Sequence, residues 1–127
     1  MREQLQIIYE DNGVVVCHKL PGIAVQSPRA GQQDMVSLLR NYFARKKENT
    51  EIFLVHRLDQ PVEGVMVFAR TKEAAANLSS QVQKRQMDKQ YLAVVEGRFE
   101  KKSGTLENFL IRDGKTNTSG VVEKEGK

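Results

Sequence analysis

The chain has 127 residues, the length of one ordinary domain, and a formal net charge of +4 from 20 Lys and Arg against 16 Asp and Glu. Its hydrophobic fraction is 39 %, and no stretch approaches the roughly 18 apolar residues of a membrane-spanning helix, so the composition excludes a transmembrane segment and fits one modest core. The single cysteine, Cys17, excludes an internal disulfide framework, and the N-terminal residues lack the apolar block of a signal peptide. We therefore expect a soluble, cytoplasmic protein whose positive charge suits a polyanionic partner.

The chain opens with a predicted β-hairpin. The β-prone residues 5–9 and 14–18 flank Asn12-Gly13, a pair that is typical of a two-residue hairpin turn. Residues 14–17 are all apolar, which predicts a strand covered on both faces.

Two helices are predicted further along. The first is expected to begin at an N-cap, Asp34, because apolar residues recur at helical spacing from residue 35 to residue 43. The second is expected to follow the N-cap Thr71 and to run from residue 72 to about residue 87. Its inward-facing residues would be Ala75, Leu78 and Val82.

Four more strands are predicted, at residues 53–55, 65–69, 90–96 and 105–112. The resulting mixture of hairpins and helices favours an α+β domain, with a mixed, mainly antiparallel sheet flanked by two helices, over a doubly wound parallel fold. No glycine-rich dinucleotide fingerprint or phosphate-binding P-loop motif occurs, so those nucleotide-binding classes are excluded.

The last residues differ in character from the rest. From Asp113 onward nearly all side chains are small or polar, and so little apolar surface does not offset the entropy of ordering a segment. We therefore expect a domain at residues 1–112 and a flexible polar tail at 113–127.

The stretch at residues 56–64, His-Arg-Leu-Asp-Gln-Pro-Val-Glu-Gly, carries the most chemistry. It places an imidazole, a guanidinium and a carboxylate where a buried strand meets a loop, and binding residues often lie at such strand ends. From the residues alone, Asp59 could be a nucleophile, a general base or a metal ligand, or it could cap a turn and pair with Arg57. A metal site is disfavoured, because no further His or Cys cluster completes it.

Residues 56–97 resemble the centre of the RluA-type pseudouridine synthases. The resemblance rests on His-Arg-Leu-Asp at 56–59 followed by a glycine and an apolar strand, together with Lys-Gln-Tyr-Leu-Ala-Val-Val-Glu-Gly at 89–97. Lys-Leu-Pro-Gly at 19–22 fits the entry into the same pattern, and the likeness extends over nearly the whole chain. It implies a pseudouridine synthase-like fold and an enzyme that isomerises uridine to pseudouridine in ribosomal or transfer RNA without a cofactor or a metal.

The resemblance also implies roles for four side chains. Asp59 would be the essential carboxylate in breaking the N-glycosidic bond, although sequence does not decide which atom it attacks. Arg57 would enter the RNA helix in place of the flipped nucleotide, or else form a salt bridge with a nearby acid. Tyr91 would stack on the target base, or else be a core aromatic residue, and His56 would position the loop or face the RNA.

Clusters of basic residues could neutralise RNA phosphates. The cluster chosen as the RNA-binding candidate is Lys84, Arg85 and Lys89, and two others lie at residues 40–47 and 101–102. Each cluster could equally be the solvated end of a helix or loop.

The family pattern is only partly present. Members of this family run past 200 residues and carry a later His-Gln-Ile-Arg-like motif whose arginine pairs with the catalytic aspartate, and nothing similar follows Asp59 here. The chain therefore resembles the N-terminal part of a catalytic domain, apparently incomplete at its C-terminus. We expect it to convert uridine very slowly on its own, which leaves a non-catalytic RNA-binding fragment as the alternative, and we expect an unpaired sheet edge that could support a dimer.

Overall fold

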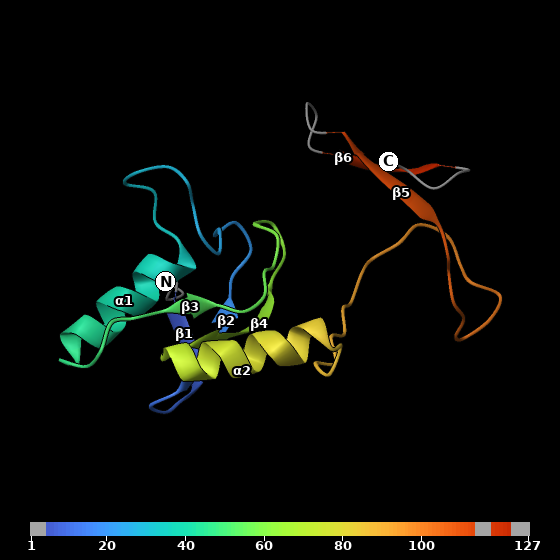
Figure 1. Cartoon of the computed structure of the whole chain (residues 1–127). Helices are drawn as coiled ribbons and strands as arrows, with labels where there is room; N and C mark the ends of the chain where they lie inside the picture. The colour runs from blue at the N-terminus through green and yellow to red at the C-terminus, as the bar shows by residue number, and fades with distance from the viewer. Residues whose placement is uncertain (1–4, 114–117, 123–127) are drawn as a thin grey trace. The chain divides into compact units, whose positions relative to one another are not determined.

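The computed structural model describes residues 5–113 and 118–122, which divide into two compact units at 1–90 and 91–127 (Figure 1). The first unit contains a sheet and two helices, and the second contains a β-hairpin. Within the described ranges, neither helix has the length and apolar character needed to cross a membrane.

The first unit begins with the predicted hairpin. Strand β1 (Leu5–Glu10) pairs antiparallel with β2 (Val14–Lys19). Between the strands, the Asp11 carboxylate accepts hydrogen bonds from the backbone N–H groups of Gly13 and Val14, each at 2.8 Å. Aspartate favours turns because its short side chain can bond the backbone of the residues that follow. The predicted hairpin is therefore confirmed.

Strands β4 (Gly64–Ala69) and β3 (Phe53–Leu54) complete a four-stranded sheet in the order β1-β2-β4-β3. All neighbouring strands are antiparallel. Side chains of a strand point alternately to the two faces of a sheet, and along β2 the alternate residues Val15, Cys17 and Lys19 are buried. One face of the sheet therefore carries the core.

Helix α1 (Met35–Arg45) packs against this face. Asp34 caps it as predicted: its carboxylate accepts a hydrogen bond from the Ser37 N–H at 2.8 Å, and the Ser37 hydroxyl accepts one from the Asp34 N–H at 3.1 Å. This reciprocal arrangement is a capping box, which satisfies two N–H groups at the helix start. The buried residues of the helix are Met35, Val36, Leu39 and Phe43.

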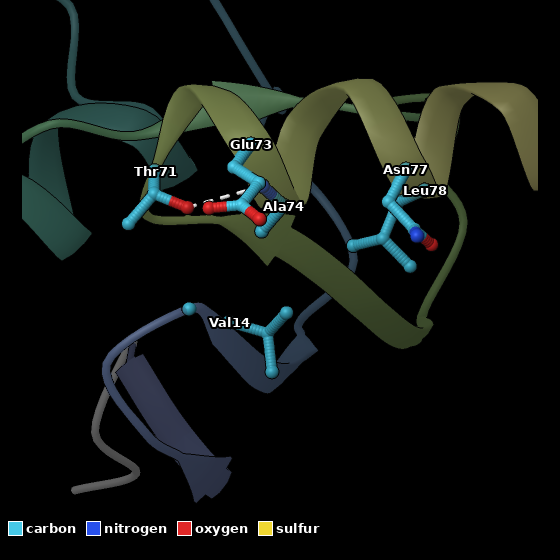
Figure 2. Close-up of a pocket in the computed structure, with 7 residues that line it drawn as sticks. Val14, Thr71, Glu73, Ala74, Asn77 and Leu78 are labelled. Atoms are coloured by element: carbon cyan, nitrogen blue, oxygen red, sulfur yellow. Dashed lines mark hydrogen bonds between the residues drawn. The ribbon is translucent and has the colours of Figure 1, made fainter.

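Helix α2 (Lys72–Gln83) lies over the opposite face of the sheet, where Val14 of β2 lines a hollow together with Ala74 and Leu78 of the helix. It begins at the predicted cap, where the Thr71 hydroxyl accepts a hydrogen bond from the Ala74 N–H at 3.1 Å (Figure 2). It ends earlier than the expected residue 87, because Arg85 adopts the left-handed φ of 56°, which a right-handed helix does not contain. The three residues that were predicted to face inward are half-buried: Ala75, Leu78 and Val82.

The α+β class with an antiparallel sheet and two flanking helices is thus confirmed. A buried arginine ties the sheet to the segments around it. Arg70, only 4 % exposed, donates from Nη1 to the Asp11 carbonyl at 2.6 Å and from Nη2 to the Glu48 carboxylate at 3.2 Å. Its guanidinium carbon lies 3.6 Å from the centre of the Phe43 ring. Arg70, which directly follows β4, therefore connects that strand to the first hairpin turn and to the C-terminal end of α1.

The second unit differs from the prediction. Its described strands are β5 (Phe109–Asp113) and β6 (Thr118–Val122), which form an antiparallel hairpin. The strand predicted at 90–96 is wrong: these residues form no strand, and Leu92 is fully exposed. A β-prone sequence forms a strand only beside a pairing partner, and none lies beside this segment within the described residues of its unit.

The predicted strand at 105–112 is found at its C-terminal end, in β5. The segment expected to be a flexible tail includes β6, whereas residues 114–117 and 123–127 lie outside the described residues. The proposed boundary between a domain at 1–112 and a tail at 113–127 stays a prediction.

We predict that Tyr42→Phe destabilises the first unit by about 1 kcal/mol at neutral pH, because the hydroxyl of Tyr42 donates a hydrogen bond to the Glu10 carboxylate. This bond, together with the Lys46 ammonium 3.0 Å from the same carboxylate, holds the pKa of Glu10 below its ordinary value. A depressed carboxyl pKa stabilises the fold above the unfolded-state value and ceases to do so as the pH falls through the folded-state value. Urea unfolding at several pH values measures the effect.

The difference between the wild type and Tyr42→Phe should therefore shrink as the pH falls below about 4. Tyr91→Phe is the matched control, because the Tyr91 side chain is 63 % exposed. A stability difference that is the same at every pH would contradict this interpretation of the Tyr42–Glu10 contact.

Candidate functional site

The candidate site is the loop at residues 55–63, which joins β3 to β4. It ends where Gly64 of β4 pairs with Lys19 of β2, so the loop lies at one end of the two central strands. A side chain placed there is carried by the most rigid part of the sheet and still reaches solvent.

Backbone hydrogen bonds hold the loop in place. The Val62 N–H donates to the Asp59 carbonyl at 2.9 Å, which closes a turn over residues 59–62. Gln60 is bound twice to Gly22: the Gly22 N–H donates to its carbonyl at 2.8 Å, and its side-chain amide donates to the Gly22 carbonyl at 2.9 Å. Gly22 has a φ of 94°, which strains any residue with a Cβ. The Lys-Leu-Pro-Gly turn at 19–22 is thus the support on which the loop rests.

A polar contact fixes the far end of the loop. The Glu63 carboxylate lies 2.6 Å from Nε2 of His18 on β2, and Nδ1 of the same imidazole lies 2.8 Å from the side-chain oxygen of Gln6 on β1. Both ring nitrogens thus face an oxygen. The contact links the loop to the first two strands of the sheet.

Asp59 and Arg57 project from this fixed backbone as exposed side chains. Within the part of the chain that the structure describes, neither side chain makes a hydrogen bond or an ion pair. The alternative in which Asp59 caps the turn and pairs with Arg57 therefore finds no contact to support it. A carboxylate and a guanidinium two residues apart are both available to a ligand.

His56 has a structural contact instead. Its Nε2 accepts a hydrogen bond from the Val67 N–H of β4 at 3.1 Å, which places the proton of the neutral ring on Nδ1. Burial and, to a lesser extent, the positive charge of Lys89 lower the pKa of His56. The ring is therefore neutral at pH 7 and anchors the start of the loop to β4. That it also faces RNA stays a prediction.

The predicted RNA-binding cluster lies just after α2. Lys84, Arg85 and Lys89 are all exposed, and the charge of Lys89 reaches His56. Cations also suit the C-terminal end of a helix, where the helix dipole is negative, so Lys84 and Arg85 have a local reason to be there. Tyr91, 63 % exposed, belongs to the second unit.

Sequence reasoning missed one residue of the site. This residue is Lys19, whose side chain is completely buried. Its ammonium donates hydrogen bonds to the carbonyl of Leu20 at 3.0 Å and to the carbonyl of Gln60, the residue that follows Asp59 in the chain, at 2.8 Å. The sequence carries no clear signal of this burial, because Val14 and Val16 on the other face of β2 are apolar as well, so the pattern does not single out the face of Lys19.

A separate hollow of 390 Å³ lies at the opposite end of the central strands, between α2 and the start of β2 (Figure 2). Val14, Ala74 and Leu78 form its apolar part, and Glu73 is its charged side chain. An acidic rim repels phosphate, so this hollow does not suit RNA.

The arrangement suits nucleophilic or general-base chemistry by a single carboxylate on a neighbouring ligand. In the described ranges there is no group of three or more His, Cys, Asp or Glu side chains that could hold a metal ion. The chemistry that these residues can offer is that of an exposed carboxylate, a nearby guanidinium and a buried ammonium.

Comparison with known proteins matches residues 13–127 to a family described as RNA pseudouridylate synthase. An uncharacterized RNA pseudouridine synthase of Bacillus subtilis, YhcT, is 33 % identical over 111 residues, which are 87 % of this chain and 37 % of that protein. The tRNA pseudouridine synthase C of Haemophilus ducreyi is 33 % identical over 74 % of this chain and 38 % of its own length. The ribosomal large subunit pseudouridine synthase D of Pseudomonas aeruginosa is 33 % identical over 98 % of this chain and 39 % of its own length.

A solved structure, human RNA pseudouridylate synthase domain containing 4, matches 64 % of this chain with a TM-score of 0.54 and 29 % identity, and the match covers 30 % of the human chain. The chain thus spans less than two fifths of the length of the relatives named here.

Proposed function

Because this chain belongs to the RNA pseudouridylate synthase family, as an N-terminal part of its RluA type, we propose that the protein isomerises uridine to pseudouridine in structured RNA. Asp59 is the reacting carboxylate in this proposal. One observation supports this role more than any other. The backbone of the turn at 59–62 is held by hydrogen bonds from the Val62 N–H to the Asp59 carbonyl and from the Gly22 N–H to the Gln60 carbonyl. The Asp59 side chain, in contrast, is exposed and has no hydrogen-bond or ion-pair partner in the described part of the chain.

The reaction needs what such a loop provides. Pseudouridine forms when the bond between the ribose and N1 of uracil breaks and the base rejoins the ribose through C5; C5 then loses its proton to water and N1 takes one up. A carboxylate that is held in a fixed place beside the sugar-base junction lowers the entropic cost of reaching the transition state. We propose that Asp59 acts at this junction.

We further propose that Arg57 and Tyr91 contact the target nucleotide. A uridine inside a helix must leave the stack before a side chain can reach its sugar, and an inserted guanidinium can fill the vacated place. Arg57 is exposed and without a hydrogen-bond or ion-pair partner in the described part of the chain, as this role requires. The exposed Tyr91 ring could stack on the uracil.

The substrate class is ribosomal or transfer RNA in this proposal, because one relative is named for tRNA and another for the large ribosomal subunit. The test uses the 127-residue chain and the longest polypeptide that its reading frame encodes. Each is incubated with tRNA and rRNA transcripts, which are then digested to nucleosides and separated by chromatography. We expect pseudouridine in at least one RNA. RNA binding by both polypeptides with no pseudouridine would contradict the proposal and favour the non-catalytic RNA-binding alternative.

We predict that replacing Lys84, Arg85 and Lys89 together by Gln weakens RNA binding and makes it less sensitive to salt. Each lost phosphate contact should reduce the slope of log affinity against log salt by about 0.7 to 0.9, so the slope should fall by roughly 2 to 3. Filter binding or fluorescence anisotropy over a range of salt concentrations measures the slope.

The matched control replaces the exposed cations Arg29, Lys72 and Arg98 by Gln, which removes the same charge outside all three basic clusters. Equal losses in the two triple variants would show that binding follows net charge alone, and the assignment of this cluster would then be wrong.

A dimer through a sheet edge stays a proposal. The outer strand β1 exposes Ile8 and Tyr9, at 57 % and 53 %, but its pairing with β2 is irregular between Ile7 and Tyr9. A bulge bends an edge strand and makes continuous pairing with another copy harder. A strictly monomeric chain at high concentration in light scattering would contradict the dimer.

A further inference from the structure

Lys19 has a position that packing alone does not explain. It is the last residue of β2, its exposed fraction is 0 %, and it lies on the face of the sheet that also carries Val15 and Cys17. A buried ammonium loses its hydration, so an apolar residue of similar length would normally serve the core better.

The hydrogen bonds of Lys19 point at the candidate site. Its ammonium donates to the Gln60 carbonyl at 2.8 Å, and the Gly22 N–H donates to the same carbonyl at the same distance. The other bond, to the Leu20 carbonyl at 3.0 Å, stays within the supporting turn. Lys19 therefore joins the turn at 19–22 to the residue that directly follows Asp59.

The positive charge of Lys19 interacts favourably with a negative charge in the same site, that of Asp59. The two carbonyls satisfy hydrogen bonds but carry no net charge. Burial lowers the pKa of Lys19, and the negative charge of Asp59 acts against that decrease.

We infer that Lys19 is a positioning residue for Asp59: its buried ammonium fixes the turn at 59–62 through the Gln60 carbonyl and thereby brings a positive charge to the segment that carries the exposed carboxylate. The inference deepens the proposed function and rests on it for its catalytic meaning. The contact itself can be measured without any activity.

The first test titrates Lys19 in the 127-residue chain by NMR of its ε-carbon. Asp59→Asn removes the carboxylate charge at an exposed position and should not disturb the fold. We expect the titration midpoint of Lys19 to fall, because the ammonium loses the nearby negative charge that favours its protonated form. Glu51→Gln, which neutralises an exposed carboxylate before β3, is the control and should leave the midpoint in place. A midpoint that moves by less than about 0.2 pH unit in Asp59→Asn would overturn the inference.

The second test examines the turn in Lys19→Met, which keeps the length of the side chain and removes its ammonium. We expect the Val62 amide, which bonds the Asp59 carbonyl, to exchange its hydrogen about tenfold faster or more, while the Val67 amide of β4 is unchanged. Unchanged exchange at Val62 would show that Lys19 does not hold the turn and would overturn this part of the inference. If Lys19→Met does not fold, the titration of Lys19 in Asp59→Asn still decides the matter.

Activity separates the inference from the proposed function. In the active polypeptide, Lys19→Met should lower kcat with little change in KM, because the RNA contacts remain while the carboxylate loses its orientation. If Asp59→Asn keeps full activity, the proposed function fails whatever the titration gives. If Asp59→Asn is inactive but the Lys19 midpoint does not respond to it, the function stands and the role of Lys19 falls.

Discussion

Asp59→Asn is expected to abolish pseudouridine formation, lowering its initial rate at least about 1,000-fold in the longest polypeptide that the reading frame encodes. Asparagine keeps the size of the side chain but has no negative charge and is neither a nucleophile nor a base. The turn should survive, because the Asp59 carbonyl accepts the hydrogen bond from Val62 and the side chain is exposed. The rate is measured with excess enzyme on a single RNA, so that product release does not limit it.

RNA affinity and thermal stability should stay close to those of the wild type in Asp59→Asn. Glu51→Gln is the control, since it also exchanges an exposed carboxylate for an amide near β3, and it should keep its activity. If Asp59→Asn lost RNA affinity to the same extent as it lost reaction rate, a purely chemical role of Asp59 would be contradicted, because the variant would then be defective in binding the RNA.

Phe43→Ala is expected to lower the free energy of unfolding of the first unit by about 3 to 5 kcal/mol. Phe43 is fully buried in the core between α1 and the sheet, and the Arg70 guanidinium lies 3.6 Å from the centre of its ring. Alanine would leave a cavity and would also leave that buried cation without the ring on which it stacks. Urea denaturation followed by circular dichroism measures the change.

Phe99→Ala is the matched control, because Phe99 is 68 % exposed and the same substitution there should change stability by less than about 0.5 kcal/mol. Equal effects at the two phenylalanines would contradict the core that the structure describes around Phe43.

Most of the first unit could be predicted from sequence, because its signals are local. The turn after β1, the Asp34 cap of α1 and the Thr71 cap of α2 each depend on side chains that bond their own neighbours in the chain. The apolar run at residues 14–17 likewise predicted a strand covered on both faces, and none of these residues is exposed in β2. Such features need no knowledge of the rest of the fold.

The failures concern distant or conditional contacts. Residues 90–96 have the composition of a strand, but a strand also needs a partner, and composition does not supply one. The early end of α2 depends on the left-handed conformation of Arg85, which arginine seldom adopts and the sequence does not signal.

The candidate site shows the same division. The residues of the His-Arg-Leu-Asp segment and its family resemblance identify it as the candidate site. The structure places it on a loop whose backbone is held by hydrogen bonds within the loop and to Gly22. The contact between Lys19 and Gln60 joins residues 41 positions apart, so it emerged only with the fold. The same holds for His18 and Glu63, which meet because β2 and β4 are neighbours.

If this chain carries the reacting carboxylate of an enzyme that moves the uridine bond from N1 to C5, the reaction releases the C5 hydrogen of uridine, and this release can be measured. An RNA transcript labelled with tritium at C5 of its uridines is incubated with the longest polypeptide that the reading frame encodes and with its Asp59→Asn variant. We expect the wild type to release tritium to water and the variant to release none above background, although both bind the RNA. Equal release by the two proteins, or binding by both with no release, would contradict this expectation.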